Sequence, residues 1–438
     1  MEEQQNQDRT DFLKETIKQR PLNRKKLIRK TIITAAMAVI FGLVACLTFL
    51  LLEPVISNRL YPEEKPSTVV LVEEKESEEI LPEDMIADDS EMSPEPATPV
   101  LEDEQIAQVL SEMKLGVEDY TSLYDSLAAV AKNVQSSMVT VVGITSDVDW
   151  FNNVYKNEGS VAGVIIADNG KELLILTNYP AIEDAELLEI TFSDEQEYEA
   201  ELKKKDSNTG LAILAVEKNT MKRTTLQAAE PVKLGTSAGS NLIGNPVIAL
   251  GQPAGVAGSV CYGFVTSAGS MVDLPDSRYK WITTDIYGSS SATGILVNLR
   301  GQVIGIIDSS HNSSDTRNLV SAIGITDLRK LIERMSNDKD IPYLGIHGAD
   351  VTLQVHEELD VPYGTYIMEI DMDSPAMAAG IQSGDVITGM GDTKVTSYQE
   401  LINGMMDMEP EETMTLTLLR QGPEGYTEME LSVTLGTR

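Results

Sequence analysis

The chain has 438 residues, of which 42% are hydrophobic and 24% are charged, proportions that suit a folded protein of two or three domains. It carries 34 Lys and Arg against 69 Asp and Glu, a formal net charge of −35. Such an excess of acidic residues argues against nucleic acid or an anionic surface as a direct partner.

The first expected element is a transmembrane helix at residues 31–52, which contain no charged residue. A helix of this length rises about 33 Å, enough to cross a bilayer. The segment 1–30 before it is basic and the sequence after it is acidic, so the positive-inside rule predicts a single-pass protein with a cytoplasmic N-terminus and extracytoplasmic C-terminal domains. A cleaved signal peptide and a lipidated Cys46 are the alternatives. The only other cysteine is Cys261, so no disulfide framework is expected.

Residues 53–104 are expected to form an acidic, disordered stalk. Residues 62–104 hold sixteen Asp or Glu, two Lys and six Pro. This composition buries too little apolar surface to offset the entropy lost on ordering, and its charges repel one another. An acidic binding tail is the alternative.

Residues 105–338 are expected to form a mainly β domain. Apolar spacing predicts helices at 106–117 and 124–135 and one late helix at 326–338. Short hydrophobic runs between turn residues predict strands at 136–146, 161–168, 172–180, 188–194, 197–205, 211–218, 245–251, 260–269, 280–286, 294–299 and 302–308. Many short strands at such spacing indicate a pair of barrels or a sandwich.

Residues 339–438 are expected to form a second, small α+β domain. They alternate predicted strands with two helical stretches, at 374–381 and 397–408.

Several phrases resemble the HtrA (Deg) family of trypsin-like serine proteases, in the family's order. They include "LILTN", "GLAILAVE", "NPVIALGQPAG", "GFVTSAG" and "ILVNLRGQVIGI", and with related phrases they cover most of residues 125–337. The resemblance implies a double β-barrel protease domain at 105–338 followed by a PDZ domain at 339–438. It also implies oligomers, because the family commonly forms trimers.

The same resemblance places the catalytic triad at residues that cannot supply it. Pro180 stands at the histidine position in "LTNYPAI", and Gly210 at the aspartate position in "GLAIL". An ungapped alignment from "LVN" places Ala292 at the nucleophile position and Ser290 at the position of the oxyanion-hole glycine. A gapped alignment places Ser291 at the nucleophile position. A serine hydroxyl needs a proton acceptor to attack a peptide bond, so we expect no catalytic residue and an inactive homologue.

No other base is evident in the sequence. The three histidines, His311, His347 and His356, lie away from the strand end where the base belongs. A Ser/Lys dyad would need Lys171 or one of the lysines at 203–205, and these stand in turn-like or alternating exposed stretches.

The PDZ region keeps its recognisable parts. "DSPAMAAGIQSGDVI" resembles the family's PDZ phrase, and the resemblance places the carboxylate-binding loop at "YLGI", which is Tyr343, Leu344, Gly345 and Ile346. A polypeptide C-terminus or an extended unfolded segment would bind there as an added strand. Leu401 and Met405, at i and i+4 of one helix, either line the groove or belong to the core.

The sequence therefore predicts a membrane-anchored, extracytoplasmic HtrA-like pseudoprotease that binds polypeptides in envelope protein quality control or regulation, with no cofactor and no metal. An active serine endopeptidase with an atypical catalytic set, and a regulatory subunit that forms hetero-trimers with active HtrA proteases, are the alternatives.

Overall fold

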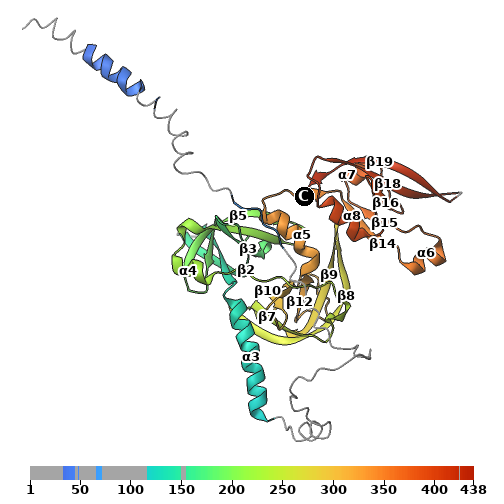
Figure 1. The fold of residues 1–438 in the computed structure, drawn as a ribbon, viewed down its shortest axis with the longest axis horizontal. Helices are drawn as coiled ribbons and strands as arrows, with labels where there is room; N and C mark the ends of the chain where they lie inside the picture. The colour runs from blue at the N-terminus through green and yellow to red at the C-terminus, as the bar shows by residue number, and fades with distance from the viewer. Residues whose placement is uncertain (1–32, 45–47, 49–65, 72–115, 149–153, 424) are drawn as a thin grey trace, which may run out of the picture. The chain divides into compact units, whose positions relative to one another are not determined.

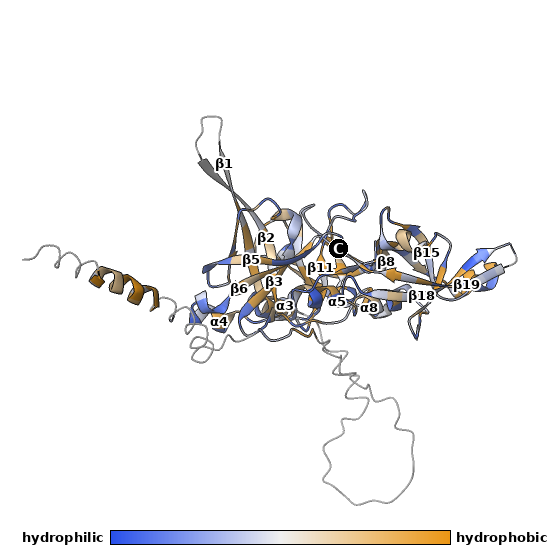
Figure 2. Ribbon diagram, turned by 90° about the horizontal axis from the view of Figure 1, so that it is seen from above, coloured by the Kyte–Doolittle hydropathy of each residue, from blue (hydrophilic) through white to orange (hydrophobic). Residues whose placement is uncertain are grey.

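The computed structural model describes residues 33–44, 48, 66–71, 116–148, 154–423 and 425–438 (Figure 1). The chain divides into two units, Met1–Lys65 and Pro66–Arg438. In the first unit, residues 33–44 are helical, apolar and exposed (Figure 2). No helix among the described residues has both the length and the apolar character needed to cross a membrane. The predicted basic segment and the remaining residues of the predicted transmembrane helix, except residue 48, lie outside the described residues.

Two closed six-stranded antiparallel barrels form the larger part of the second unit. The first barrel contains β1 (Met138–Val148), β2 (Val154–Asp168), β3 (Glu172–Asn178), β4 (Leu187–Thr191), β5 (Glu197–Asp206) and β6 (Leu211–Glu217). The second contains β7 (Pro246–Gln252), β8 (Ser259–Leu274), β9 (Ser277–Tyr287), β10 (Thr293–Val297), β11 (Val303–Ile307) and β12 (Leu319–Gly324). Both barrels have the same strand order, β1-β2-β3-β6-β5-β4 and β7-β8-β9-β12-β11-β10. Closure leaves neither sheet with a free edge.

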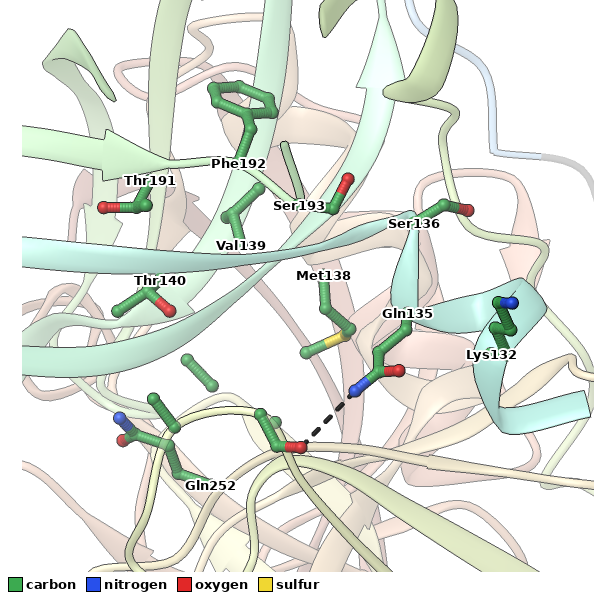
Figure 3. Close-up of a pocket in the computed structure, with 14 residues that line it drawn as sticks. Lys132, Gln135, Ser136, Met138, Val139, Thr140, Thr191, Phe192, Ser193 and Gln252 are labelled. Carbon is green, nitrogen blue, oxygen red and sulfur yellow. Dashed lines mark hydrogen bonds between the residues drawn. The ribbon is translucent and has the colours of Figure 1, made fainter. Parts of the chain in front are cut away.

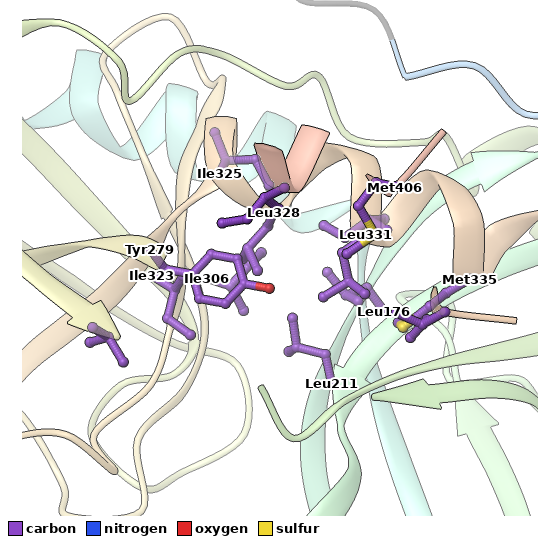
Figure 4. Close-up of a cluster of buried hydrophobic side chains, with 14 of the residues drawn as sticks. Leu176, Leu211, Tyr279, Ile306, Ile323, Ile325, Leu328, Leu331, Met335 and Met406 are labelled. Carbon is purple, nitrogen blue, oxygen red and sulfur yellow. The ribbon is translucent and has the colours of Figure 1, made fainter. Parts of the chain in front are cut away.

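Three helices accompany the barrels: α3 (Val117–Gln135), α4 (Arg223–Ala228) and α5 (Ile325–Ser336). The helix α5 contacts strands of both barrels. Figure 4 shows its Leu328 and Leu331 among side chains of the first barrel, such as Leu176, and of the second barrel, such as Ile306. Helix α5 therefore closes a hydrophobic cluster that joins the two barrels.

The C-terminal domain is built on a sheet of β14 (Ile346–Asp350), β15 (Thr365–Ile370), β16 (Val386–Met390), β18 (Thr413–Gly422) and β19 (Gly425–Thr434), in that order, with β17 (Thr393–Lys394) paired to β16. Its helices are α6 (Leu353–Leu359), α7 (Pro375–Ala379) and α8 (Tyr398–Met405). A short pair, β13 (Pro342–Tyr343) and β20 (Gly436–Thr437), brings the two ends of the domain together. The strand β14 lies at the edge of the sheet.

The mainly β architecture and the small α+β domain agree with the sequence, and several local predictions need correction. The strand β12 and the helices α4 and α6 were not predicted, since α4 and α6 are only six and seven residues long. The predicted helix at 106–117 lies outside the described residues except for its last two.

One segment of the predicted stalk is ordered. Ser67 donates its backbone N–H to Asn169 O, and Val69 donates to Asn337 Oδ1 and is buried. The prediction averaged composition over 62–104 and so overlooked the apolar run at 69–72, which buries Val69 against the barrels. The rest of the predicted stalk lies outside the described residues.

Candidate functional site

Pro180 and Gly210 lie beside each other at the end of the first barrel. Pro180 is in the short 3₁₀ turn Tyr179–Ala181 that follows β3, and Gly210 precedes β6. Tyr179 N donates to Gly210 O at 2.7 Å. A Cβ atom on Gly210 would lie 3.3 Å from Pro180 Cδ, so side chains at these two positions would touch. The two sequence-predicted positions are therefore brought together, as an imidazole and its orienting carboxylate would have to be.

Ala292 ends the serine-rich turn before β10. Its side chain is buried and its N–H donates to Ser289 O at 3.1 Å. Gly294, two residues later, has φ +126°, and a Cβ there would lie 2.0 Å from Leu250 O. Only glycine fits at such a position. In the ungapped alignment Gly294 occupies one of the family's glycines; the assignment of Ala292 to the nucleophile position stays a prediction.

Two of the serine hydroxyls in the turn are hydrogen-bonded to each other. Ser289 Oγ and Ser291 Oγ lie 3.0 Å apart, and Ser291 N donates to Ser289 Oγ at 3.2 Å. Ser290 O accepts a hydrogen bond from Ser309 Oγ at 2.7 Å. In the part of the chain that the structure describes, no histidine or lysine bonds to these hydroxyls.

Neighbours of Pro180, Gly210 and Ala292 line one small cavity between the barrels. Asn178, Thr209 and Thr293, each within two residues of one of these positions, contribute to its wall. Its volume is about 20 Å³, which is room for about one water molecule. This cavity alone is too small to hold a substrate backbone.

The lysines considered for a dyad are held by other partners. Lys203 Nζ is 2.7 Å from Glu172 Oε2, and Lys205 Nζ donates to Tyr179 Oη at 2.8 Å. The hydrogen bond from Lys204 to Asp340 raises the pKa of Lys204, whereas a lysine base needs a lowered pKa. Among the described residues, no hydrogen bond or ion pair joins Lys171 to a serine hydroxyl of the turn.

The histidines are also engaged elsewhere. His311 packs edge-on against Trp281, with ring centroids 5.5 Å apart. His347 Nε2 lies 3.2 Å from Asp371 Oδ1, and His356 Nδ1 lies 2.7 Å from Val361 O. None of these contacts is with the serine turn before β10.

The predicted carboxylate-binding loop of the C-terminal domain does hold a carboxylate. The side chain of Asp276, in the turn between β8 and β9, accepts hydrogen bonds from the backbone N–H groups of Leu344, Gly345 and Ile346. Gly345 has φ +83°, and a Cβ there would meet Ser374 Cβ at 2.3 Å. The loop therefore needs glycine at this position to keep three successive amides pointing at one ligand.

The other predicted peptide-binding residues are placed differently. Tyr343 is partly buried and its hydroxyl donates to Asp371 Oδ2 at 2.7 Å. Leu401 and Met405 are each 1% exposed and belong to the main hydrophobic cluster. Leu401 and Met405 are therefore core residues in this structure and do not line an open groove. Their helix, α8, packs against β14 and β15.

Comparison with known proteins identifies this combination of domains. Residues 161–306 match the family model described as trypsin-like peptidase domain, and residues 342–434 match that described as PDZ domain. The protein named serine protease Do-like HtrA of Lactococcus lactis subsp. lactis is 30% identical over 301 residues, which cover 63% of this chain and 71% of that protein. This chain belongs to the HtrA family. The subsp. cremoris protein of the same name is 27% identical over 323 residues, or 69% of this chain and 77% of the relative.

Solved HtrA-type structures share the fold. The structure titled "HtrA-type protease AlgW with decapeptide" matches with a TM-score of 0.53 at 20% identity, covering 71% of this chain and 98% of AlgW. A second AlgW structure, titled "HtrA-type protease AlgW with tripeptide", has a TM-score of 0.51 at 21% identity. At such identity the likeness concerns the fold.

This HtrA-family chain also has a larger pocket that sequence reasoning missed. It lies where the end of α3 meets both barrels, has a volume of about 480 Å³, and is shown in Figure 3. Phe192 and Met138 form apolar wall, and Gln135 Nε2 donates to Gly258 O at 3.4 Å across it. Its residues come from segments distant in sequence, so no local motif marks it. Among the described residues, no group of three or more His, Cys, Asp or Glu could hold a metal ion.

Proposed function

We propose that this chain is a membrane-anchored, extracytoplasmic HtrA-like pseudoprotease that binds polypeptides, in envelope protein quality control or its regulation. Binding would use the PDZ domain and, when the barrels open, the degenerate cleft. The single observation that carries the proposal is the contact between Pro180 and Gly210, where the fold would need an imidazole and a carboxylate.

Triad catalysis requires a base that takes the proton of the attacking hydroxyl. Proline and glycine have no titratable side chain, and Ala292 has no hydroxyl. Even with Ser291 as nucleophile, the absence of a base removes about 10⁶-fold in kcat from a triad enzyme. The serine turn would then serve to shape β10 and its surroundings rather than to acylate.

Polypeptide binding survives such a loss. A PDZ loop holds a terminal carboxylate through backbone N–H groups, and the peptide adds as a strand to a sheet edge, which here is β14. Neither interaction involves the triad.

The membrane anchor is proposed from residues 31–52. The run has no charged residue, and its described part carries exposed apolar side chains such as Ile33, Val39 and Phe41. Exposed side chains of this kind on a helix are what lipid would cover.

We predict that the full-length chain in detergent does not cleave unfolded casein, and that replacing Ser289, Ser290 and Ser291 together by alanine changes nothing. Release of acid-soluble peptides over hours measures this, with an active HtrA-type protease as positive control. Ser290 and Ser291 are exposed and Ser289 is partly exposed, so the variant loses only the hydrogen bonds of Ser289 Oγ within the turn; circular dichroism of parent and variant checks that both are folded.

The outcome also separates the alternatives. Casein cleavage that is lost in the triple variant would establish the atypical active protease, a candidate supported by the relatives' names as serine proteases. Cleavage that appears only when an active relative is added, and exceeds that of the relative alone, would favour the regulatory subunit.

A further inference from the structure

The PDZ carboxylate-binding loop is already occupied by a side chain of this chain. Asp276 Oδ2 accepts from Leu344 N at 2.7 Å and from Gly345 N at 2.8 Å, and Oδ1 accepts from Ile346 N at 3.0 Å. Three consecutive backbone amides therefore converge on one carboxylate, which is how such a loop would hold a peptide C-terminus.

The backbone of the same residue also bonds as an added strand would. Asp276 N donates to Ile346 O at 2.9 Å, at the start of the edge strand β14. The flanking strands continue the contact, since β8 touches β14 and β9 touches α8. Arg278 in the same hairpin reaches Asp350 at the far end of β14, with 3.5 Å between Nη1 and Oδ2. The hairpin β8–β9 thus lies along the edge that an extended peptide would use.

The contact is buried and has a charged neighbour. Asp276 is completely buried. Arg438 Nη1 donates to Pro275 O at 2.9 Å and to Ser277 Oγ at 3.2 Å, and Arg438 Nε lies 2.9 Å from Asp206 Oδ1. Burial raises the pKa of the Asp276 carboxyl, although the three amides and Arg438 oppose this. Because the site is buried, an external carboxylate can reach these amides only when the hairpin moves away.

We propose that Asp276 is an internal ligand of the PDZ carboxylate-binding loop, and that a polypeptide with a free C-terminus binds this loop only by displacing the β8–β9 hairpin. The second half rests on the proposed polypeptide-binding function. Asp276 belongs to the protease-like domain. Ligand binding to the PDZ domain is therefore coupled to release of the end of the β8–β9 hairpin that carries Asp276.

The first test measures the contact itself, without any ligand. Asp276→Asn removes the charge but keeps the shape, and Asn accepts the left-handed conformation that Asp276 adopts at φ +53°. In the full-length chain in detergent, amide hydrogen exchange at residues 344–346 should become about tenfold to a hundredfold faster. Asp273→Asn is the matched control: Asp273 is in the same hairpin, partly exposed and paired with Arg278, and should leave this exchange unchanged. Unchanged exchange in Asp276→Asn would overturn the proposal.

The second test uses fluorescein-labelled decapeptides ending in Leu, Ile, Val or Phe, each with a free carboxylate or a C-terminal amide. Free-carboxylate peptides should bind Asp276→Asn about tenfold or more tightly than the parent or Asp273→Asn, and amidated peptides should not. Equal affinity for parent and Asp276→Asn would contradict the displacement step.

Two further outcomes separate this inference from the proposed function. If Asp276→Asn does not fold, the parent chain alone provides the test. A free-carboxylate peptide at millimolar concentration should speed amide hydrogen exchange in the hairpin at 273–278. Binding of the peptide without faster exchange there would overturn the proposed displacement of the hairpin. Faster exchange at 344–346 in Asp276→Asn with no peptide bound to any variant would support the internal ligand and refute C-terminal peptide binding as the function.

Discussion

Gly294→Ala should destabilise the second barrel by about 4 kcal/mol or more. The backbone there has φ +126°, and the new Cβ would be placed 2.0 Å from Leu250 O, inside any allowed contact distance. Relief requires β10 to move away from β7, with which it pairs at Gly251. Urea denaturation of the full-length chain followed by tryptophan fluorescence measures the loss, since Trp281 lies in this barrel.

The control for this substitution is Gly170→Ala. Gly170 also has a left-handed backbone, with φ +90°, but nothing lies within 4 Å of its added Cβ. Gly170→Ala should lower the free energy of unfolding by only about 1–2 kcal/mol, the cost of placing a residue with a Cβ in the left-handed conformation. Equal losses at both positions would mean that the close approach to Leu250 is not what fixes glycine at the turn.

Arg334→Met should destabilise the chain by about 2–4 kcal/mol. Arg334, on α5, is 7% exposed at its side chain and donates from Nη1 to Met406 O and from Nη2 to Asp340 O. Nη2 also lies 2.7 Å from Glu409 Oε2. Methionine fills the space but leaves these acceptors without a donor, which weakens the contact between α5 and the PDZ domain. Urea denaturation measures the resulting loss in the free energy of unfolding.

Lys339→Met is the matched control, because Lys339 pairs with the same Glu409 at 2.7 Å but is 52% exposed at its side chain. An exposed ion pair contributes about 0–1 kcal/mol. A loss at Arg334 as small as that at Lys339 would show that the carbonyl bonds do not join the domains.

Much of the architecture could be predicted because its signals are local. Strands such as β3 and β6 are continuous buried runs, and their turns contain Gly, Asn and Asp residues that end each run. Family phrases then fixed the order of the strands. The neighbouring positions of Pro180 and Gly210 also followed from phrase alignment, although they are thirty residues apart.

What the sequence did not predict depends on contacts between distant residues. Asp276 stands in an ordinary Leu-Pro-Asp-Ser turn, and nothing near it in the sequence indicates that it meets amides at 344–346. The pocket beside α3 likewise joins segments from Lys132 to Gly258. The burial of Val69 was not predicted, because composition was averaged over about forty mostly acidic residues and the apolar run of four had little effect on that average.

The proposed loss of the catalytic base is compatible with a PDZ loop that keeps its binding groups. Catalysis depends on two or three side chains, whereas carboxylate binding in this loop depends on backbone amides held by Gly345 and the packing around it. Substitution therefore removes the first function far more easily than the second.

Covalent labelling tests the absence of a usable nucleophile most directly, because it needs no knowledge of the substrate. The full-length chain in detergent is incubated with excess fluorophosphonate, and its intact mass is compared with that of the Ser289→Ala, Ser290→Ala, Ser291→Ala triple variant. We expect no adduct on either protein, since no imidazole or lysine among the described residues bonds to these hydroxyls. One adduct per parent chain that is missing from the triple variant would contradict it.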